Sequence, residues 1–409
     1  MTQVAARLQP FGTTIFTEMT ALANKHGAVN LAQGFPDFDG PEAAKAAAKA
    51  AIDAGEAQYA RMSGVPRLNL AVARAFSDRT GLPVDPDAHV TITSGCTEAI
   101  AATFLGLINP GDEVILFEPF YDSYRACVAM AGATPRFVTL RPGPGAGVGV
   151  GVGVGVGVGV GVGGFGFDPE ELRRAFSDKT RAILVNTPHN PTGKVFTRAE
   201  LDLIAGLCRD RNVIAITDEV YEHLTYGREH VSLASLPGMF ERTVTLSSVG
   251  KSFSLTGWKI GWAIAPPALT AGVRAAHQFL TFATATPLQH GAAAIIANPG
   301  PVVREYVELF RRNRDVLADA LRELGFRVFD AEGTYFIMAD HTEVSRRLGL
   351  SGDRAMCTAM IERYGVAAIP PSVFYENQEH GRSLVRFAYC KKAATVDEAI
   401  RRLARMRSG

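Results

Sequence analysis

Ser247-Ser248-Val249-Gly250-Lys251-Ser252-Phe253-Ser254-Leu255-Thr256-Gly257-Trp258-Lys259-Ile260-Gly261-Trp262 is the stretch that places one lysine among small and hydroxylated residues, with a second cation eight residues later. A lysine amine that is buried near other cations loses its proton and becomes a nucleophile, which a guanidinium does not do. A hydroxyl and a cation suit a phosphate group. The run therefore matches pyridoxal phosphate, whose aldehyde forms an imine with a lysine. By itself, the run also fits a surface lysine after a strand.

Two stretches upstream meet the other needs of that cofactor: Asn186-Thr-Pro-His-Asn190-Pro-Thr-Gly193 and Thr217-Asp218-Glu219-Val220-Tyr221. Asp218 follows the apolar run 213–217, so it lies at the carboxyl end of a predicted strand, where a carboxylate can keep a pyridine nitrogen protonated. Asn190 and Tyr221 offer an amide and a phenol for the 3-oxygen of the ring. Alone, the first stretch is an ordinary turn and Asp218 is a helix cap. Together with Lys251, in this order, they predict a pyridoxal phosphate site.

A third motif, Gly95-Cys96-Thr97, opens the apolar stretch 99–107, which predicts a helix. The first amides of a helix have no partner within it, and the helix dipole favours an anion at that end. The backbone amides of these three residues are therefore candidates for binding the phosphate of the cofactor.

Short apolar runs separated by helical lengths predict an α/β protein with a mostly parallel sheet that helices cover on both faces. The predicted strands are residues 89–93, 113–117, 136–140, 181–185, 213–216, 243–246 and 260–264. Ligands of such sheets bind at the carboxyl ends of the strands. Gly95, Asn190, Asp218 and Ser248 each follow a predicted strand closely, so the pattern and the motifs indicate the same site.

The domain organisation follows from a change of pattern near residue 291, where long amphipathic helices such as residues 301–324 begin. We expect residues 40–290 to form a large cofactor-binding domain and residues 291–409 to form a smaller C-terminal domain. Residues 1–39 should form an N-terminal arm that packs with the small domain.

A low-complexity insert occupies residues 147–164, where valine stands at every even position from 148 to 162 and glycine at nearly every other one. Glycine at every second position costs backbone entropy and offers no second packing face, so a flexible or weakly β-structured loop inside the large domain is expected. A membrane span is disfavoured because half of the segment is glycine. A simple-repeat expansion without function predicts that deletion of residues 147–163 leaves activity intact.

Composition is that of an ordinary enzyme of 409 residues with a formal net charge of +1, so no electrostatic case for nucleic-acid binding exists. Five cysteines without paired spacing argue against a disulfide framework and a zinc site, and the histidines show no metal spacing. No signal peptide or membrane segment is predicted from the N-terminus, so the cytoplasm is the expected location.

These motifs together resemble the class I/II aminotransferases of the pyridoxal-phosphate fold-type I superfamily. The resemblance runs from about residue 7 to 405. Within the family, the sequence is similar to the branch of kynurenine, glutamine and methionine aminotransferases. Further motifs of that branch are Gln33-Gly34-Phe35-Pro36-Asp37-Phe38, Glu118-Pro119-Phe120-Tyr121-Asp122 and residues 256–262. Bacterial N-succinyldiaminopimelate aminotransferases look nearly as similar. The resemblance implies a large domain with a mostly parallel sheet and a smaller α+β domain.

The resemblance also implies a role for each matched residue. Lys251 would hold the cofactor and, once displaced, move a proton between the substrate's alpha carbon and the cofactor. Ser248 and Lys259 would bind the phosphate with the amides of residues 95–97, and Tyr121 would stack on the ring. Tyr59 would reach the phosphate site of a neighbouring subunit, which implies a homodimer with shared active sites. Arg386 would clamp the substrate's alpha-carboxylate, assisted by the Gly34 backbone and Asn190.

The expected activity is transfer of an amino group from an L-amino acid to a 2-oxo acid by a ping-pong mechanism. A dicarboxylate-specific enzyme would place a second cation in its pocket, and residues 279–287 offer none, which favours apolar, aromatic or sulfur-containing donors such as methionine, glutamine or kynurenine. Three alternatives stay open: an N-succinyldiaminopimelate aminotransferase, a carbon–sulfur β-lyase acting on cysteine conjugates, and a non-catalytic binding protein. The complete set of Lys251, Asp218, Asn190, Tyr221 and Arg386 disfavours the last.

Overall fold

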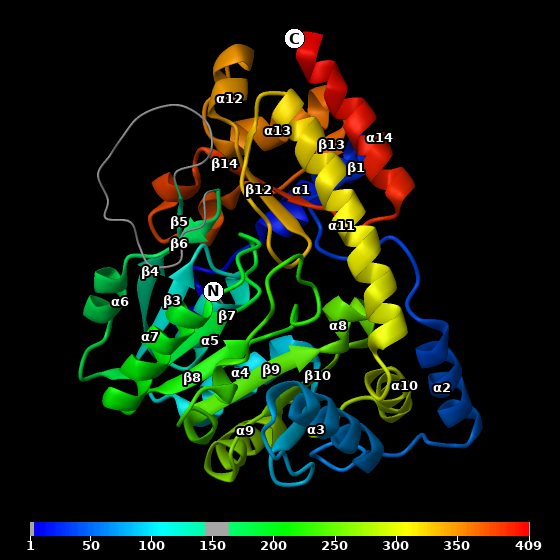
Figure 1. Ribbon diagram of the computed structural model, residues 1–409, viewed down its shortest axis with the longest axis vertical. Helices are drawn as coiled ribbons and strands as arrows, with labels where there is room; N and C mark the ends of the chain where they lie inside the picture. Colours follow the sequence, from blue (N-terminus) through cyan, green and yellow to red (C-terminus); the bar gives the residue numbers. More distant parts are fainter. Residues whose placement is uncertain (1–3, 144–162, 409) are drawn as a thin grey trace.

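A computed structural model describes residues 4–143 and 163–408, and a seven-stranded sheet of order β2-β10-β9-β8-β7-β3-β4 forms its centre (Figure 1). Strands β9, β8, β7, β3 and β4 run parallel to their neighbours in that order. Strand β10 alone runs antiparallel to both of its neighbours, β2 and β9. The predicted α/β class with a mostly parallel sheet is confirmed.

Each strand of this sheet coincides with a predicted strand to within a few residues. The strands are β2 (Val90–Ser94), β3 (Glu113–Glu118), β4 (Thr134–Thr139), β7 (Thr180–Asn186), β8 (Ile214–Asp218), β9 (Thr243–Ser248) and β10 (Ile260–Ile264). Their apolar runs read continuously because both faces of the sheet are covered. Along β7, Ile183 and Val185 face one apolar cluster and Ala182 and Leu184 face another.

Helices cover the two faces of the sheet. On one face, the apolar cluster contains residues of α4 (Gly95–Leu107), α5 (Asp122–Met130) and α9 (Pro267–Leu280). On the other face it contains residues of α6 (Pro169–Ala175) and α7 (Arg198–Asp210). Helix α6 starts after Asp168, whose side chain caps it by accepting a hydrogen bond from the amide of Glu170.

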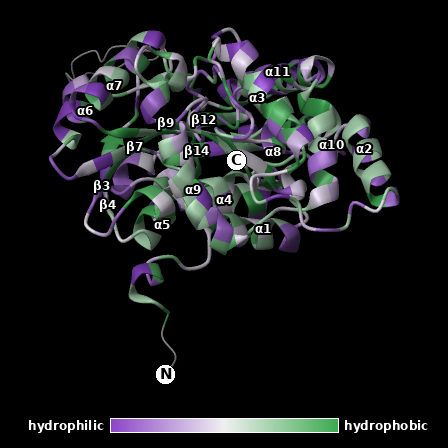
Figure 2. Cartoon of the chain, turned by 90° about the horizontal axis from the view of Figure 1, so that it is seen from below, coloured by the Kyte–Doolittle hydropathy of each residue, from purple (hydrophilic) through white to green (hydrophobic). Residues whose placement is uncertain are grey.

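Three further helices, α2 (Glu42–Asp53), α3 (Pro66–Thr80) and α10 (Thr286–Ile296), pack around the β2–β10 end of the sheet. Figure 2 shows that the outer helices carry hydrophilic and hydrophobic residues side by side, as expected of helices with one buried face. The predicted boundary at residues 290 and 291 falls inside α10, which packs with α2 and α3.

The C-terminal part has its own antiparallel sheet, of order β11-β12-β14, formed by β11 (Arg327–Val328), β12 (Phe336–Asp340) and β14 (Leu384–Ala388). The long predicted amphipathic helix is α11 (Gly300–Glu323). The other helices of this part are α12 (Thr342–Leu348), α13 (Asp353–Tyr364) and α14 (Ala393–Leu403). Together they enclose the largest apolar cluster of the described residues.

The N-terminal segment packs on this C-terminal part. Helix α1 (Ile15–Lys25) contributes Ile15, Met19 and Ala23 to the same apolar cluster. Strand β1 (Val29–Asn30) pairs in parallel with β13 (Val366–Ala367). Chain segments more than 300 residues apart in sequence are thereby joined.

The Gly–Val insert extends from a two-stranded antiparallel pair, β5 (Arg141–Pro142) with β6 (Phe165–Gly166). Residues 147–162 of the insert, and with them the predicted loop, lie outside the described residues. The remaining elements are one short helix, α8 (Val249–Ser252), and 3-10 turns at Ala6–Leu8, Leu233–Ser235, Phe240–Arg242, Thr256–Trp258, Pro371–Phe374, Gln378–Gly381 and Ala404–Ser408. Among residues 4–143 and 163–408, no helix is long and apolar enough to cross a membrane.

Candidate active site

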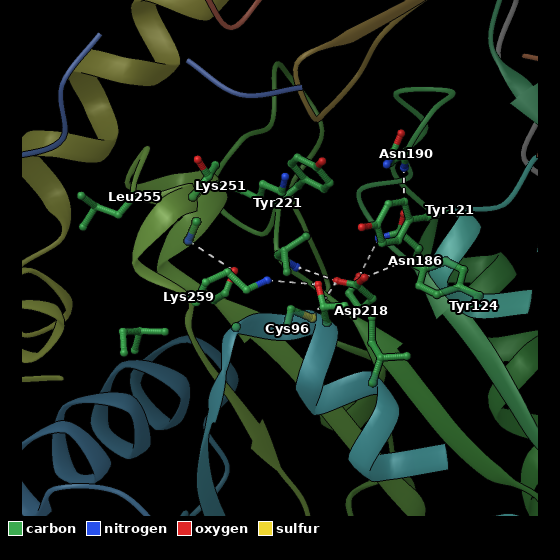
Figure 3. A pocket seen from close by; sticks show the side chains of 18 residues that line it. Cys96, Tyr121, Tyr124, Asn186, Asn190, Asp218, Tyr221, Lys251, Leu255 and Lys259 are labelled. Atoms are coloured by element: carbon green, nitrogen blue, oxygen red, sulfur yellow. Dashed lines mark hydrogen bonds between the residues drawn. The ribbon is translucent and has the colours of Figure 1, made fainter. Parts of the chain in front are cut away.

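A cavity of about 250 Å³ opens at the carboxyl ends of the central strands (Figure 3). It lies where the motifs that follow β2, β7, β8 and β9 meet. Ten of the predicted site residues line it: Gly95, Cys96, Thr97, Tyr121, Asn190, Asp218, Tyr221, Ser248, Lys251 and Lys259. The structure therefore brings together residues that are up to 164 positions apart in the sequence (95 to 259).

Asp218 is the last residue of β8, and its buried carboxylate is held by three donors. The Tyr124 hydroxyl donates to Oδ2 at 2.7 Å, and the Val220 amide donates to Oδ1 at 3.2 Å. The Cys96 thiol lies 3.7 Å from Oδ1. Burial raises the pKa of Asp218, while these hydrogen bonds and the Lys251 amine act in the opposite direction. A protonated ring nitrogen beside this carboxylate would supply a positive counter-charge for the buried carboxylate.

The side chains of Tyr124 and Cys96 are site residues that the sequence did not predict. Burial and the neighbouring Asp218 raise the pKa values of both groups well above their ordinary values, so both keep their protons as donors. Tyr124 stands three residues after Tyr121, in the first turn of α5, and the two rings meet edge to face at 5.6 Å. That helical spacing is the one signal in the sequence that could have indicated Tyr124.

Lys251 lies in the short helix α8 directly after β9, and it is partly buried. Its Nζ atom is 5.9 Å from the ring centres of both Tyr221 and Tyr335. Burial lowers the pKa of the Lys251 amine, although Cys390 and Asp218 oppose the shift. A lowered pKa leaves more of the amine unprotonated, which is the form that attacks an aldehyde.

The other end of the cavity is built around the N-terminus of α4. Gly95 has a φ of +75°, a left-handed conformation that favours glycine. A Cβ atom on Gly261 of β10 would lie 2.6 Å from the Cys96 nitrogen, so β10 can approach the helix start only because this residue is glycine. Lys259 places its Nζ atom 3.5 Å from the Thr97 Oγ1 atom. Free amides and a cation at one helix N-terminus form an anion site.

Arg386 of β14 is fully buried and has no carboxylate as a hydrogen-bond partner among the described residues. Its Nη2 atom donates to the Ala32 carbonyl at 2.8 Å, and its Nη1 atom donates to Asn190 Oδ1 at 3.2 Å. The Nε atom has no partner. Burial lowers the pKa of Arg386 to about 10. Both of these hydrogen-bond partners are neutral oxygens.

Three aromatic rings surround this guanidinium. Its carbon lies 4.3 Å from the ring centre of Phe336, 5.2 Å from that of Phe16 and 5.6 Å from that of Phe374. Cation–π contacts of this kind stabilise a desolvated guanidinium without neutralising it. The charge of Arg386 is therefore still available to an anion.

Gly34 and Asn190 are the two residues predicted to assist this arginine. The Gly34 carbonyl accepts a hydrogen bond from the Tyr335 hydroxyl at 2.6 Å, and it is Ala32 rather than Gly34 that contacts Arg386. A Cβ atom on Gly34 would lie 2.7 Å from the Phe336 ring, so the close approach requires glycine. Asn190 is fixed by its own amide, which donates to Asn186 Oδ1 at 2.8 Å.

Tyr59 is the one predicted cofactor-binding residue that does not line the cavity of its own chain. Its side chain is 85% exposed, and its ring meets that of Phe282 at 5.4 Å. No group of three or more histidine, cysteine or acidic residues that could hold a metal occurs among the residues that the structure describes.

Known proteins place this chain in a family. The sequence profile of Aminotransferase class I and II matches residues 26–403. The probable N-succinyldiaminopimelate aminotransferase DapC of Mycobacterium tuberculosis is 45% identical over 408 residues, which cover 98% of this chain and 97% of that protein. The solved structure of N-succinyldiaminopimelate aminotransferase from that organism has a TM-score of 0.90 and covers 99% of this chain and 100% of its own.

Two other relatives have different substrates in their names. The methionine aminotransferase of Escherichia coli is 36% identical over 98% of each chain. Human kynurenine–oxoglutarate transaminase 1 is 37% identical over 97% of each. The chain thus belongs to the class I and II aminotransferase family, has the fold-type I architecture, and is an enzyme that transfers amino groups. The predicted family, fold class and enzyme class are confirmed.

Proposed function

We propose that this aminotransferase uses pyridoxal phosphate, as its family does, to move an amino group from an L-amino acid to a 2-oxo acid. The observation that carries the proposal is the arrangement of Lys251, Asp218 and Arg386. A nucleophilic amine and a carboxylate line one cavity, and beside it lies a guanidinium to which no carboxylate of the described residues is hydrogen-bonded. The cofactor, when bound, supplies a ring that accepts electrons from the substrate's alpha carbon.

The residues of the chain have distinct roles in this proposal. The Lys251 amine would hold the cofactor through its aldehyde, and the same Nζ atom would carry a proton to and from the substrate's alpha carbon. Asp218 would keep the ring nitrogen protonated, and the positions of Asn190 and Tyr221 in the cavity suit the ring's 3-oxygen. Tyr121 suits a stacking role on the ring.

The two anions of the reaction are assigned to opposite ends of the site. Ser248, Lys259 and the amides of residues 95–97 suit the cofactor phosphate, because they surround the N-terminus of α4. Arg386 suits the substrate's alpha-carboxylate as a two-pronged donor, with the Gly34 backbone and Asn190 assisting. Within the described part of the chain, the Nε atom has no hydrogen-bond partner and no carboxylate is hydrogen-bonded to the guanidinium, which supports this assignment.

For the amino donor, we propose an apolar, aromatic or sulfur-containing side chain, like those of methionine, glutamine or kynurenine. The rings of Phe16, Phe336 and Phe374 around Arg386 support this class, since they make the carboxylate end of the site apolar. N-succinyldiaminopimelate is the second candidate, because the relative from Mycobacterium tuberculosis that bears its name is 45% identical to this chain. Carbon–sulfur cleavage of cysteine conjugates is the alternative reaction that the same residues would serve.

For the assembly, we propose a homodimer in which Tyr59 reaches the phosphate site of the partner subunit. Support comes from exposed apolar side chains close to this residue in the fold: Tyr59 itself, Phe279 at 90% exposure, and Phe282. Such side chains suit an interface. The five cysteines are free, which suits the reducing cytoplasm.

We also propose a division of the chain into a large cofactor-binding part and a smaller C-terminal part, with the N-terminal arm packed on the smaller one. The large part extends to Ile296 rather than to residue 290, because α10 packs with α2 and α3. Arg386 belongs to the smaller part and Lys251 to the larger one.

The test is a half-reaction with purified protein and a panel of L-amino acids: methionine, glutamine, kynurenine, aspartate and N-succinyldiaminopimelate. We expect the absorbance band of the bound cofactor to shift from the aldehyde-derived to the amine form with at least one donor, and the fastest donor identifies the class. Lys251→Ala should abolish the shift. Release of pyruvate and ammonia from a cysteine conjugate without a 2-oxo acid would identify the lyase instead, and absence of any cofactor band would refute the proposal.

A further inference from the structure

Behind the phosphate end of the site, a buried histidine and a glutamate form a pair that neither the family motifs nor the proposed roles use. His277 of α9 is fully buried, and the Glu98 side chain in the first turn of α4 is 10% exposed. The His277 Nδ1 atom is 2.9 Å from Glu98 Oε1, and its Nε2 atom is 2.9 Å from the Met62 carbonyl oxygen.

The hydrogen-bond partners fix the number of protons on this pair. A carbonyl oxygen only accepts, so His277 Nε2 carries a hydrogen. The Thr281 hydroxyl also lies 3.2 Å from Nδ1, but two lone pairs on atoms 2.9 Å apart would repel each other, so a proton must lie between Nδ1 and Glu98 Oε1, whichever of the two atoms holds it. The pair is then either an imidazolium with a carboxylate or a neutral imidazole with a carboxylic acid, and its net charge is zero in both cases.

Glu98 has one favourable and one unfavourable effect at the N-terminus of α4. Its second oxygen, Oε2, accepts a hydrogen bond from the Ser94 amide at 2.8 Å, which satisfies a backbone donor at the start of α4. The amides of residues 95–97 remain free for an anion. A bare carboxylate in this first turn would, however, compete with a phosphate for the positive potential of the same helix end.

We infer that His277 is a positioning residue that neutralises Glu98, so that the N-terminus of α4 presents its free amides to the cofactor phosphate without a competing charge. This inference rests on the proposed cofactor site. His277 also holds the Met62 carbonyl, and the Thr286 hydroxyl holds the Gln58 carbonyl at 2.7 Å. The segment that carries Tyr59 is therefore held by hydrogen bonds to His277 and Thr286.

The experiment measures equilibrium dissociation constants of the full-length protein, stripped of cofactor, for pyridoxamine phosphate and for pyridoxamine. The two probes differ only in the phosphate group. We expect His277→Gln to weaken pyridoxamine phosphate about tenfold, because the glutamine amide can still bond Met62 but cannot neutralise Glu98. Binding of pyridoxamine should change by less than about twofold.

A second substitution distinguishes charge from structure. Adding Glu98→Gln to His277→Gln removes the charge, so the double variant should regain the affinity for pyridoxamine phosphate to within about threefold of the wild type. If His277 only supports the fold, the double variant stays as weak as the single one, and the inference is wrong. Equal binding of pyridoxamine phosphate by the wild type and His277→Gln would also overturn it.

Glu98→Gln alone gives an independent test if His277→Gln does not fold. Its amide can donate to Nδ1 of a neutral His277, so all hydrogen bonds persist and the affinity for pyridoxamine phosphate should stay within about twofold. A tenfold gain would mean that the pair was not neutral, and a tenfold loss would mean that charge is not the controlling factor. If the wild type itself does not bind pyridoxamine phosphate, the proposed cofactor site fails instead.

Discussion

Lys194 and Arg386 are both buried cations, and the difference between their surroundings distinguishes a structural position from a binding position. The Lys194 side chain is 3% exposed, and its Nζ atom lies 2.8 Å from a carboxylate oxygen of Glu200, which is fully buried. Glu200 in turn belongs to the capping box of α7, with Thr197 as its partner. Arg386 is 1% exposed and donates only to neutral oxygens.

Burial alone therefore does not distinguish a structural cation from one that binds a ligand. A buried cation that is paired with a carboxylate of the same chain is already neutralised. Removal of either member leaves an isolated buried charge. A buried cation without such a carboxylate is neutralised only when an anion binds. Arg386 lies beside Asn190, which lines the cavity that contains Lys251, and this is where the proposed function requires a partner for the substrate carboxylate.

The largest expected effect comes from Arg386→Gln. Because the guanidinium is the proposed partner of the substrate carboxylate, the variant should lose at least about a thousandfold in kcat/KM of the half-reaction. Cofactor affinity and thermal stability should change far less than the rate, since no carboxylate of the described residues loses a hydrogen bond to this guanidinium. Stopped-flow absorbance against donor concentration measures the kcat/KM of the half-reaction. A value within tenfold of wild type would refute the assignment of Arg386 to the substrate carboxylate.

Lys194→Met should show the opposite profile. It leaves the Glu200 carboxylate buried without its cation, so the free energy of unfolding should fall by about 3 kcal/mol. Urea unfolding of the holoenzyme, analysed wherever the transition is reversible, gives this value. The kcat/KM of the folded variant should stay within about twofold of wild type, because Lys194 does not line the cavity. Lys194→Met combined with Glu200→Gln is the matched control and should recover most of the loss.

Lys251→Met should stabilise the cofactor-free protein at neutral pH by a few degrees. Burial lowers the pKa of Lys251 from its ordinary value of 10.5, so the unfolded chain binds more protons than the folded one between the lowered pKa and 10.5. Wild-type stability therefore rises with pH across that window, while the variant lacks this rise. Melting curves from pH 7 to pH 10 should show the difference shrinking, and a constant difference would contradict the lowered pKa.

The smallest expected effects concern the donors to Asp218. Tyr124→Phe removes a hydrogen bond of 2.7 Å and should slow the half-reaction by about tenfold without changing the donor concentration that gives half the maximal rate. Cys96→Ala removes a weak donor at 3.7 Å and should slow it by less than about threefold. A change in the absorbance band of the bound cofactor should accompany the rate change. Equal effects of the two variants would contradict the graded geometry.

The sequence predicted the central strands well because local patterns specify them. Residues 182–185 are apolar throughout, and these residues of β7 are indeed buried on both faces of the sheet. The sites after the strands followed from the same logic, since Asp218 and Ser248 end β8 and β9. The antiparallel direction of β10 was not predicted, because one apolar run pairs equally well in either direction until its neighbours are known.

The sequence by itself was enough to identify Lys251, Asp218 and Asn190, from their residue types and their order along the chain. These side chains approach the cavity from the ends of strands. The tertiary structure alone decided which groups meet them. Tyr124 bonds Asp218 across 94 positions, Arg386 bonds Asn190 across 196, and His277 faces Glu98 across 179. The reason is physical: the residue type specifies the chemistry a side chain can perform, whereas its charge state and partners depend on burial and on distances that arise only when the sheet and its helices pack.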